Sequence, residues 1–278
     1  ATMTTLSTHD TKRSEDVRAR LSVLSEIPDM WAEVVSEWSA AVSFDPLLDY
    51  LGWQNLMAAW PISVERFTDY LLKAAREAKT HISWVNPDPA YEEGVRQFAR
   101  RAVKQPVGDF TGRIDGFAMA NSLGAKLVQL MMPGVPDLYQ GNEVTDFSLV
   151  DPDNRRQPRY PAIPVTDWDA AKLRVTTQAL LLRRRLDPGT PYVPMAADGE
   201  AADHAIAFAR PGRRVRAVAV ATRLPVGLSL RPGWGSTTLT LPPGTWRDLL
   251  SGGLYTGRIP LAHLLARYPV ALLESHEL

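Results

Sequence analysis

The sequence predicts an α/β region followed by a small all-β domain, and three observations support this prediction. Residues 2–8 are short, β-branched and uncharged, as is typical of a buried strand. Apolar residues at helical spacing follow, and a later helix runs into a Pro-Gly break and a second short apolar run. Past Pro188 the apolar runs become short and are separated by Pro and Gly turns, which indicates antiparallel strands.

Residues 1–14 are expected to form a strand and the loop that follows it, and residues 15–110 a helical insertion. In the insertion Val17, Leu21 and Leu24 recur at helical intervals, which indicates an amphipathic helix. Prolines divide the stretch into about four or five helices, because proline lacks the amide that a helix interior needs. They stand at positions 28, 46, 61, 87 and 89.

A second α/β unit is expected over residues 111–187. Its first helix is predicted at Gly116–Met132 and is followed at once by Pro133-Gly134, a short apolar run and a polar turn. The next stretch, 146–160, is a loop dense in charge, which composition alone also allows to be a solvated turn. A further helix, roughly Ala170 to Arg185, closes the unit.

Residues 188–278 are predicted to form a C-terminal antiparallel β-sandwich domain. Pro-Gly and Gly-Gly pairs separate its short apolar runs, and such pairs favour turns between antiparallel strands. Its strands are expected at Ala205–Ala209, Arg214–Thr222, Ser236–Leu241 and Ala271–Glu274.

Composition excludes several classes of function. Lys and Arg number 31 and Asp and Glu also number 31, so the chain has no net charge at pH 7. The basic cluster Arg183–Arg185 is too short to bind a nucleic acid. The chain has no cysteine, which excludes disulfides and thiolate chemistry. Its five histidines show no paired ligand spacing, so we expect no metal.

No apolar run approaches the roughly 20 residues that cross a bilayer, and the first residues lack the layout of a signal peptide. We therefore expect no membrane association and a cytoplasmic protein. With 278 residues, 45% of them hydrophobic, the chain is long enough for one large core or two smaller ones. Because an active-site segment lies so near the first residue, we also expect that an amino-terminal portion is missing.

The end of the opening strand concentrates chemically active side chains. The pair His9-Asp10 comes first, and the cations Lys12 and Arg13 follow directly. In an α/β barrel the catalytic groups stand at the carboxyl ends of the strands, because the loops there converge over the barrel mouth. The sequence therefore favours an active-site segment here.

A structural interpretation of the same segment stays open. In that interpretation Asp10 or Ser14 caps the following helix, and Glu15 and Asp16 lie in its first turn. Such residues satisfy the free amides at a helix start and interact favourably with its dipole.

The pair His9-Asp10, the run Pro133–Pro136 with Tyr139–Glu143, and the terminal β domain together resemble the last third of the α-amylase superfamily. More narrowly, four stretches in order along the chain resemble its maltooligosyltrehalose synthase family: Ser7–Arg20, Gln54–Pro61, Lys73–Trp84 and Ser148–Arg156. The chain departs from the family pattern at Asn142, where threonine is expected. It also departs at 157–159, where Gln-Pro-Arg replaces a more usual Pro-Val-Asp.

The resemblance implies the last strands and helices of a (β/α)8 barrel, with the helical insertion after strand seven. It also implies (1->4)-alpha-D-glucan 1-alpha-D-glucosylmutase activity, an isomerisation that turns the reducing-end α-1,4 linkage of a maltooligosaccharide into the α,α-1,1 linkage of trehalose. Such a retaining transfer needs a nucleophilic carboxylate and an acid/base carboxyl. The superfamily carries both on earlier strands, so the chain is expected to be inactive without an amino-terminal portion of the same enzyme.

By the same resemblance Asp10 is the third catalytic carboxylate, which binds hydroxyls of the sugar that becomes oxocarbenium-like. His9 would donate to the same sugar. Lys12 and Arg13 would keep Asp10 ionised and orient a neighbouring sugar. Further substrate contacts are expected from two stacking aromatics and from the polar loops. These are Trp84, Tyr139, Gln140, Glu143, Asp151, Asp153, Asn154 and Arg155.

Alternatives accompany these contacts. Trp84 and Tyr139 are equally consistent with core packing, and half of the loop residues with Arg-carboxylate bridges that hold the loop together. The resemblance implies no cofactor and no metal. Two other functions stay open: a non-catalytic glucan-binding or assembly module, and a hydrolase of the same superfamily that releases free sugar.

Overall fold

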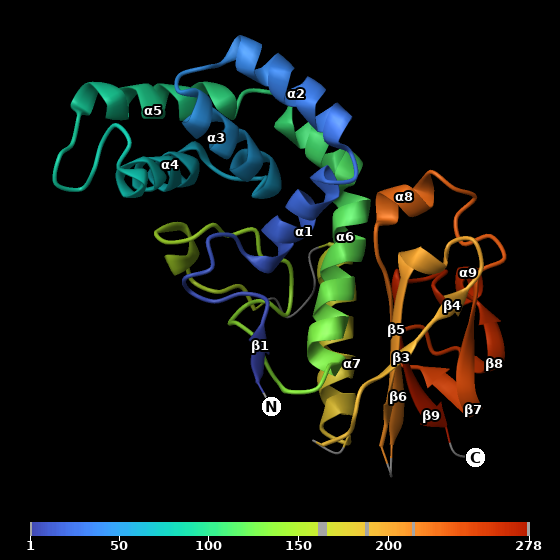
Figure 1. Cartoon of the computed structure of the whole chain (residues 1–278). Coiled ribbons are helices and arrows are strands. Elements are labelled where there is room, and N and C mark those ends of the chain that lie inside the picture. The colour runs from blue at the N-terminus through green and yellow to red at the C-terminus, as the bar shows by residue number, and fades with distance from the viewer. Residues whose placement is uncertain (1, 161–165, 187–188, 213–214, 277–278) are drawn as a thin grey trace. The chain divides into compact units, whose positions relative to one another are not determined.

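The computed structural model describes residues 2–160, 166–186, 189–212 and 215–276, and these fold as two compact units (Figure 1). The helical unit consists of Ser7–Ala118 and Asp146–Gln157. The sheet unit consists of the residues up to Leu6, Met119–Thr145 and the chain from Pro158 onward. Each unit is described by itself below.

The helical unit contains α1 to α5, the first part of α6 and the short 3-10 helix η1. The four or five helices expected for the insertion are confirmed as five. Their bounds are α1 Glu15–Leu24, α2 Pro28–Ala41, α3 Pro46–Ala58, α4 Val64–Ala78 and α5 Pro89–Ala102; α6 spans Val107–Met131 and η1 Asp153–Arg155.

Local sequence signals start several of these helices. Prolines occupy the first turn of α2, α3 and α5, where a missing amide costs nothing. Asp45 accepts hydrogen bonds from the amides of Leu47 and Leu48 at 3.0 and 3.1 Å. Ser63 accepts one from the amide of Arg66 at 3.3 Å. These caps satisfy amides that a helix leaves unpaired at its amino end.

The Asp45 cap predicts a pH-dependent contribution to stability. Burial opposes ionisation of its carboxyl, but hydrogen bonds from the Leu48 amide, the Tyr91 hydroxyl and the Leu47 amide outweigh burial and lower the pKa of Asp45. A lowered pKa stabilises the fold above the ordinary pKa, and this contribution is lost as the pH falls through the folded-state pKa. Asp45→Ala is therefore expected to lower the unfolding free energy by about 1 kcal/mol near neutral pH, and by less in acid.

Urea unfolding at about pH 7 and at about pH 3 would measure this difference. Asp45→Asn keeps a capping oxygen without the charge, so it serves as the control and should retain most of the neutral-pH stability. If the cost of Asp45→Ala is the same at both pH values, the ionised cap is wrong.

Aromatic side chains form the centre of the helical unit. The Trp38 ring lies 6.0 Å from Trp31, 5.4 Å from Trp53 and 5.9 Å from Phe110 between centroids. Trp53 in turn contacts Phe98 at 5.3 Å. All five are buried, and such tilted and edge-on pairs add to the stability that burial alone supplies. These tryptophans are therefore core residues.

Two short parallel strands open the sheet unit. β1 (Met3–Thr5) pairs with β2 (Val135–Asp137), which follows α6 directly after the Pro-Gly break. The Gln129 side-chain amide of α6 donates to the carbonyls of Thr4 and Asp137 at 3.1 and 2.7 Å. It thereby ties both strands to the helix. The expected helix-break-strand unit is confirmed, whereas two strands do not by themselves establish a barrel.

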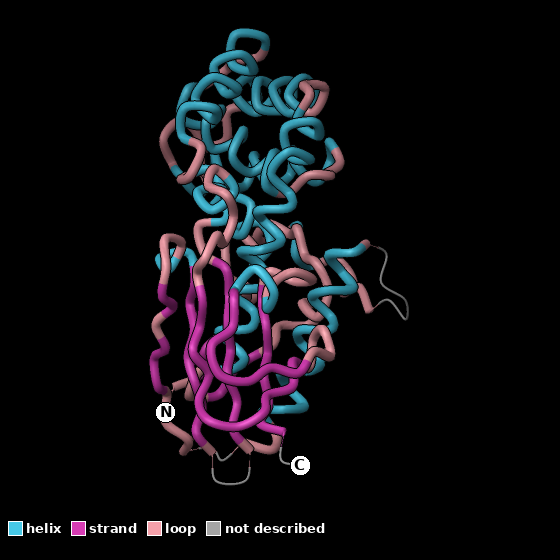
Figure 2. Tube along the Cα trace, turned by 90° about the vertical axis from the view of Figure 1, so that its right-hand side faces the viewer, coloured by secondary structure: helices cyan, strands magenta, loops and turns pink. Residues whose placement is uncertain are grey.

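The other described strands form one antiparallel sheet of seven, in the order β3-β5-β6-β9-β7-β4, with β8 paired to β7. Their bounds are β3 Val193–Met195, β4 Ala197–Asp198, β5 Ala205–Pro211, β6 Arg216–Thr222, β7 Thr238–Asp248, β8 Leu254–Pro260 and β9 Val270–His276. The predicted sandwich of two sheets is not observed, because hydrogen bonds join these strands into a single curled sheet (Figure 2). The long β7 permits this, since β4 pairs with its first residues and β9 with its last.

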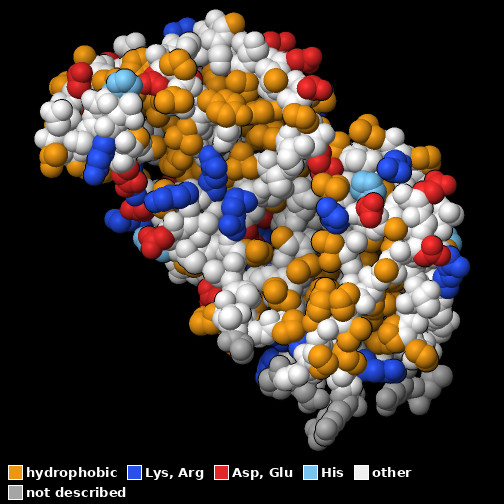
Figure 3. Space-filling model, in the orientation of Figure 1, with side chains coloured by type: hydrophobic (Ala, Val, Ile, Leu, Met, Phe, Trp, Pro, Cys, Tyr) orange, Lys and Arg blue, Asp and Glu red, His pale blue; other side chains and the backbone are white. Residues whose placement is uncertain are grey.

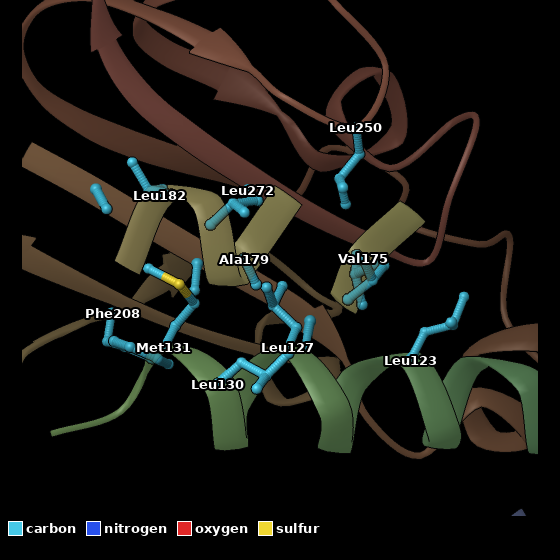
Figure 4. Close-up of a cluster of buried hydrophobic side chains, with 14 of the residues drawn as sticks. Leu123, Leu127, Leu130, Met131, Val175, Ala179, Leu182, Phe208, Leu250 and Leu272 are labelled. Carbon is cyan, nitrogen blue, oxygen red and sulfur yellow. The ribbon is translucent and has the colours of Figure 1, made fainter. Parts of the chain in front are cut away.

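Both faces of this sheet are buried. Along β6, Ala217, Ala219 and Ala221 face one core, and Val218 and Val220 face the other. The first core takes its helical side chains from α6 and α7 (Asp167–Arg183), which cover that face of the sheet. Figure 4 shows Leu123, Leu127, Leu130, Val175, Ala179 and Leu182 among them. Helices and sheet thus share one core within the sheet unit.

Leu127 lies fully buried in this helix-sheet core. Leu127→Ala is expected to lower the unfolding free energy by about 2–5 kcal/mol, because it removes buried methyl groups and leaves a cavity. Thermal or urea unfolding would measure the loss. Leu181→Ala, at an exposed position of α7, is the matched control and should cost about 0.5 kcal/mol or less. Equal losses in both variants would contradict the packing described.

Sequence patterns identify β5, β6, β7 and β9 but not β3, β4 or β8. β3 and β4 have three and two residues, too few for a periodic pattern, and β8 is mostly exposed.

α6 begins at Val107, well before the expected Gly116, because the buried Phe110 and Ile114 hold its first turns in spite of two glycines. Three short helices lie between strands of the sheet: η2 (Ala202–His204), α8 (Pro225–Ser229) and α9 (Leu261–Leu264). None of the described helices is both long and apolar enough to span a membrane.

Candidate functional site

His9 and Asp10 lie at the tip of a tight turn in the helical unit. The Thr11 amide donates to the Thr8 carbonyl at 3.3 Å, and the Thr8 amide donates to the Thr11 hydroxyl at 2.8 Å. The two threonine hydroxyls are themselves 2.8 Å apart. Because these bonds close the turn around its two central residues, His9 and Asp10 both remain exposed.

The structural interpretation of this segment holds for Ser14 and not for Asp10. Ser14 is the N-cap residue of α1, with Glu15 and Asp16 in the first turn. Its hydroxyl makes no capping bond and instead donates to the Asp146 carbonyl at 2.5 Å. Asp10 takes no part in the cap, and among the described residues its carboxylate has no hydrogen-bond or ion-pair partner. It is therefore available to a ligand.

A loop from much later in the chain, residues 146–157, pairs with the segment after the turn. The Val150 amide donates to the Lys12 carbonyl at 3.1 Å, and the Ser14 amide donates to the Ser148 carbonyl at 3.0 Å. The two stretches form an antiparallel bridge. The structure thus brings together two of the motifs that the sequence singled out, although the whole helical insertion separates them in the chain.

Asn154 connects this loop to the turn itself. Its side-chain nitrogen donates to the His9 carbonyl at 2.6 Å. Its side-chain oxygen is buried and has no hydrogen-bond partner among the described residues. A buried acceptor without a partner costs free energy, so a ligand hydroxyl would be stabilised at this position.

Asp151 lies between two cations. Its Oδ1 accepts from Lys73 Nζ at 2.5 Å, and its Oδ2 accepts from Arg155 at 3.1 Å. The hydrogen bond from Lys73 lowers the pKa of Asp151 in spite of partial desolvation, and the charges of Lys73, Arg155 and His9 lower that pKa further. Charged side chains of both signs gather over α4 and this loop (Figure 3). Asp151 is therefore an ionised carboxylate of defined orientation.

Asp153 has a different environment. Its side chain is 0% exposed, and Arg66 holds both of its oxygens, with Nε at 2.6 Å and the terminal nitrogen at 3.0 Å. The Leu149 amide donates to it at 2.8 Å, and Arg156 lies 3.5 Å away. Bidentate guanidinium-carboxylate pairs fix geometry strongly. Asp153 therefore fits the alternative interpretation, in which an Arg-carboxylate bridge holds the loop together.

Arg13 is bound to the helical insertion. Its guanidinium donates to the side-chain carbonyls of Asn55 and Gln54 of α3 at 2.8 and 3.2 Å. No direct contact with Asp10 is among the described interactions, so the predicted effect of Arg13 on Asp10 stays a prediction. A pocket of about 300 Å³ lies beside Arg13, at the small end of the size range for ligand sites. It is lined by Lys12, Arg13, Leu51, Tyr70, Lys73, Ala74, Glu77 and Val150.

The other predicted contacts come from separate segments. Trp84, between α4 and α5, is 58% exposed, and the Arg76 guanidinium lies 4.8 Å from its ring centroid; it is therefore not a core residue. Tyr139, Gln140 and Glu143 belong to the sheet unit, in the turn after β2. Tyr139 is half-buried and Gln140 exposed. One carboxylate oxygen of Glu143 is buried without a hydrogen-bond partner among the described residues.

Two residues that shape this site, Arg66 and Lys73 of α4, are not among the predicted ones. Each binds a carboxylate of the loop 146–157, across 87 and 78 positions of sequence respectively. The sequence gives a partial signal for these two cations. Arg66 and Lys73 are seven positions apart, and side chains two helical turns apart lie on one face of a helix. Nothing local indicates which carboxylates they meet.

The described residues hold no group of three or more His, Asp or Glu side chains arranged around a possible metal position. The site instead offers an unpaired carboxylate, an imidazole, an oriented carboxylate and an amide oxygen, all near one turn and its partner loop. Such donors and acceptors match the paired hydroxyls of a sugar. The arrangement therefore suits a polyhydroxyl ligand.

Comparisons with known proteins were made for the whole sequence. No family model matches the chain. Curated proteins from two strains of Mycobacterium tuberculosis, provisionally named maltooligosyl trehalose synthase, are 42% identical to it over 288 residues. The match covers 98% of this chain and 37% of each relative. The chain thus spans little more than a third of the length of these relatives.

Solved structures give the same result. The maltooligosyltrehalose synthase from Arthrobacter ramosus matches with a TM-score of 0.91 at 42% identity, over 99% of this chain and 38% of that one. A hypothetical maltooligosyl trehalose synthase of Sulfolobus tokodaii matches with a TM-score of 0.78 at 26% identity, over 97% of this chain and 38% of that one. Nearly every residue of this chain therefore has a counterpart in proteins of one kind.

Proposed function

The chain belongs to the maltooligosyltrehalose synthase family, and from this premise we propose that it forms the carboxyl-terminal part of a trehalose-forming isomerase. The substrate is a maltooligosaccharide, and the reaction converts its reducing-end α-1,4 linkage into an α,α-1,1 linkage. One observation supports this most directly: the exposed His9-Asp10 turn lies against the loop that carries Asp151, Asn154 and Arg155.

In the proposed mechanism Asp10 is the third carboxylate of the active site. A nucleophile and an acid/base carboxyl from the amino-terminal portion break the α-1,4 bond, protonate the leaving glucose and form a glycosyl-enzyme of inverted configuration. Attack of the glucose anomeric hydroxyl on this intermediate inverts the carbon again, so configuration is retained overall. Asp10 accepts hydrogen bonds from hydroxyls of the sugar whose anomeric carbon becomes positive. These hydrogen bonds strengthen as that charge develops. His9 donates to the same sugar. Because Asp10 has no partner among the described residues, no internal bond has to break first.

The loop 146–157 binds the neighbouring glucose unit in this proposal. Asp151 accepts a hydrogen bond from one hydroxyl, and Arg155 donates one to an adjacent hydroxyl. The unpaired Asn154 oxygen accepts a hydrogen bond from another hydroxyl. Asp153 keeps the loop in shape through Arg66 and does not need to touch the sugar. Of the loop residues predicted as contacts, three therefore bind sugar and one acts as support.

Transfer without hydrolysis requires that water stays out while the released glucose turns over, so that its anomeric hydroxyl attacks the glycosyl-enzyme. The helical unit is the proposed cover. The pocket beside Lys12 and Arg13 is lined by residues of α3 and α4 as well, so the insertion contributes directly to the walls around the sugar.

Further contacts are proposed for residues outside the turn and loop. Trp84 offers an exposed ring for stacking on a sugar, with Arg76 bound to one part of it. In the sheet unit Tyr139, Gln140 and the unpaired oxygen of Glu143 stay proposed sugar contacts of that unit.

The proposed partner is the amino-terminal portion of the same enzyme. β1 and β2 would be two neighbouring strands of a (β/α)8 barrel, and this portion would supply the others. Met3 and Val135 on these strands are exposed, and short parallel strands are seldom stable outside a larger sheet. We expect the complex to be cytoplasmic, which cell fractionation would test.

The proposal is tested by incubating maltohexaose with this chain, with the amino-terminal portion of a family member, and with both together. Loss of reducing ends only in the mixture is expected, since a terminal α,α-1,1 linkage has no free anomeric carbon. Loss with this chain alone would place the nucleophile within these residues and overturn the mechanism. Free glucose as the main product would identify a hydrolase.

Sugar affinity would separate the remaining alternative. If calorimetry shows maltohexaose binding to the chain while the mixture and a single polypeptide joining both portions remain inactive, the chain is a glucan-binding module that lacks the chemistry.

A further inference from the structure

Helix α4 places two cations on one face toward the loop 146–157. Arg66 and Lys73 stand two helical turns apart, and each pairs with a different loop carboxylate, Asp153 and Asp151 respectively. The two pairs are not equivalent. Asp153 is fully buried, whereas the side chain of Asp151, in the middle of the same loop, is 23% exposed.

Several bonds other than the Lys73 pair hold the loop. Arg66 binds both oxygens of Asp153, and the Leu149 amide and Arg156 bind the same carboxylate. The backbone bridge between Arg13 and Leu149 adds a further connection. The loop therefore keeps its path without Lys73, so the pair of Lys73 and Asp151 is available for another purpose.

Lys73 is the more confined of the two cations that bind Asp151. Its side chain is only 15% exposed, whereas that of the second partner, Arg155, is 65% exposed and less confined. Each bond uses one lone pair of one oxygen, so each oxygen keeps a second lone pair for a ligand hydroxyl. The bond from the Lys73 ammonium thus leaves the outer acceptor positions of the carboxylate open.

We propose that Lys73 is a positioning residue of this enzyme: from α4 it holds the Asp151 carboxylate in the orientation that receives adjacent sugar hydroxyls. This inference rests on the proposed contact between Asp151 and the substrate. Lys73 also lines the 300 Å³ pocket together with Lys12, Arg13 and Glu77. Glu77, on the same helix, also lies 3.6 Å from the Lys73 ammonium.

The test uses a single polypeptide that joins the amino-terminal portion of a family member to this chain, with maltohexaose as substrate. Lys73→Gln is expected to lower kcat/KM by about 10–100-fold, mostly in kcat, because a small misplacement of a positioned group costs that much. Lys73→Arg should restore part of the loss, since it keeps a charged donor. Lys104→Gln, an exposed lysine of the same unit, is the matched control and should behave as the parent.

A double-mutant cycle with Asp151→Asn completes the test. If Lys73 acts through Asp151, the double variant should be no slower than Asp151→Asn alone by more than about twofold. Multiplied losses would overturn the inference, as would parent-like activity of Lys73→Gln beside an impaired Asp151→Asn. In both cases the proposed function survives. Parent-like activity of Asp151→Asn would instead remove the sugar contact on which the inference rests.

A second measurement follows the Asp151 carboxyl carbon by NMR as the pH is varied. In Lys73→Gln its titration midpoint should move to higher pH, and Lys104→Gln should leave it unchanged. A midpoint that does not move in Lys73→Gln would overturn the inference, because the carboxylate would then not depend on the ammonium.

Discussion

Replacing Asp10 by asparagine is expected to lower kcat for trehalose formation by about 10²–10³-fold, since one oriented electrostatic contact to a developing charge is worth that much. Asparagine keeps the size of the side chain and one acceptor oxygen but removes the negative charge. The loss should appear mainly in kcat, because the contact strengthens in the transition state more than in the bound substrate. Reducing-end loss from maltohexaose, measured in the single polypeptide that joins both portions, would give both constants.

The control for Asp10→Asn is Asp29→Asn, at an exposed position in the first turn of α2. It removes the same charge from the same unit and should leave kcat unchanged. Stability offers a further check: Asp10 is exposed and has no partner among the described residues, so Asp10→Asn should unfold within about 0.5 kcal/mol of the parent. Activity of Asp10→Asn within twofold of the parent would remove Asp10 from the catalytic site.

Replacing Arg66 by methionine is expected to lower the unfolding free energy of the chain by about 3–5 kcal/mol, because it leaves the buried carboxylate of Asp153 without its main partner. Arg66 supplies two hydrogen bonds to that carboxylate, which is 0% exposed. Methionine retains much of the apolar length of the side chain, so the loss reports the missing charge. Urea unfolding followed by tryptophan fluorescence would measure it, since Trp38 and Trp53 lie in the core of the same unit.

An exposed ion pair provides the comparison. Arg100 and Glu93 of α5 lie 3.3 Å apart with both side chains about half in solvent, and Arg100→Met should cost at most about 1 kcal/mol. Combining Arg66→Met with Asp153→Leu should recover part of the Arg66→Met loss, because no unpaired charge then remains buried. A single-variant loss as small as that of Arg100→Met would show that Asp153 is not held as described.

Much of the helical unit follows from local signals in the sequence. Prolines at the starts of α2, α3 and α5 and the carboxylate cap of Asp45 act within one turn of chain. The bonds that close the His9-Asp10 turn are equally local, because they join Thr8 to Thr11. Long strands such as β6 can also be predicted from the sequence, since their apolar composition extends over several residues.

Tertiary structure decided differences between residues that local sequence signals do not distinguish. Asp151 and Asp153 are the same residue type two positions apart in one loop, yet Asp151 is partly exposed and Asp153 is buried under Arg66. Their partners come from α4, and only packing of that helix against the loop determines which cation meets which carboxylate. The single curled sheet, in place of two stacked ones, likewise depends on which strands pair with the two ends of β7. Sequence by itself determined the family, most of the helices and the residue types at the turn, because those rest on residue identity and near neighbours. The partners and the burial of Lys73, Arg66 and the two aspartates were decided by packing across the fold, which depends on residues far apart in the chain.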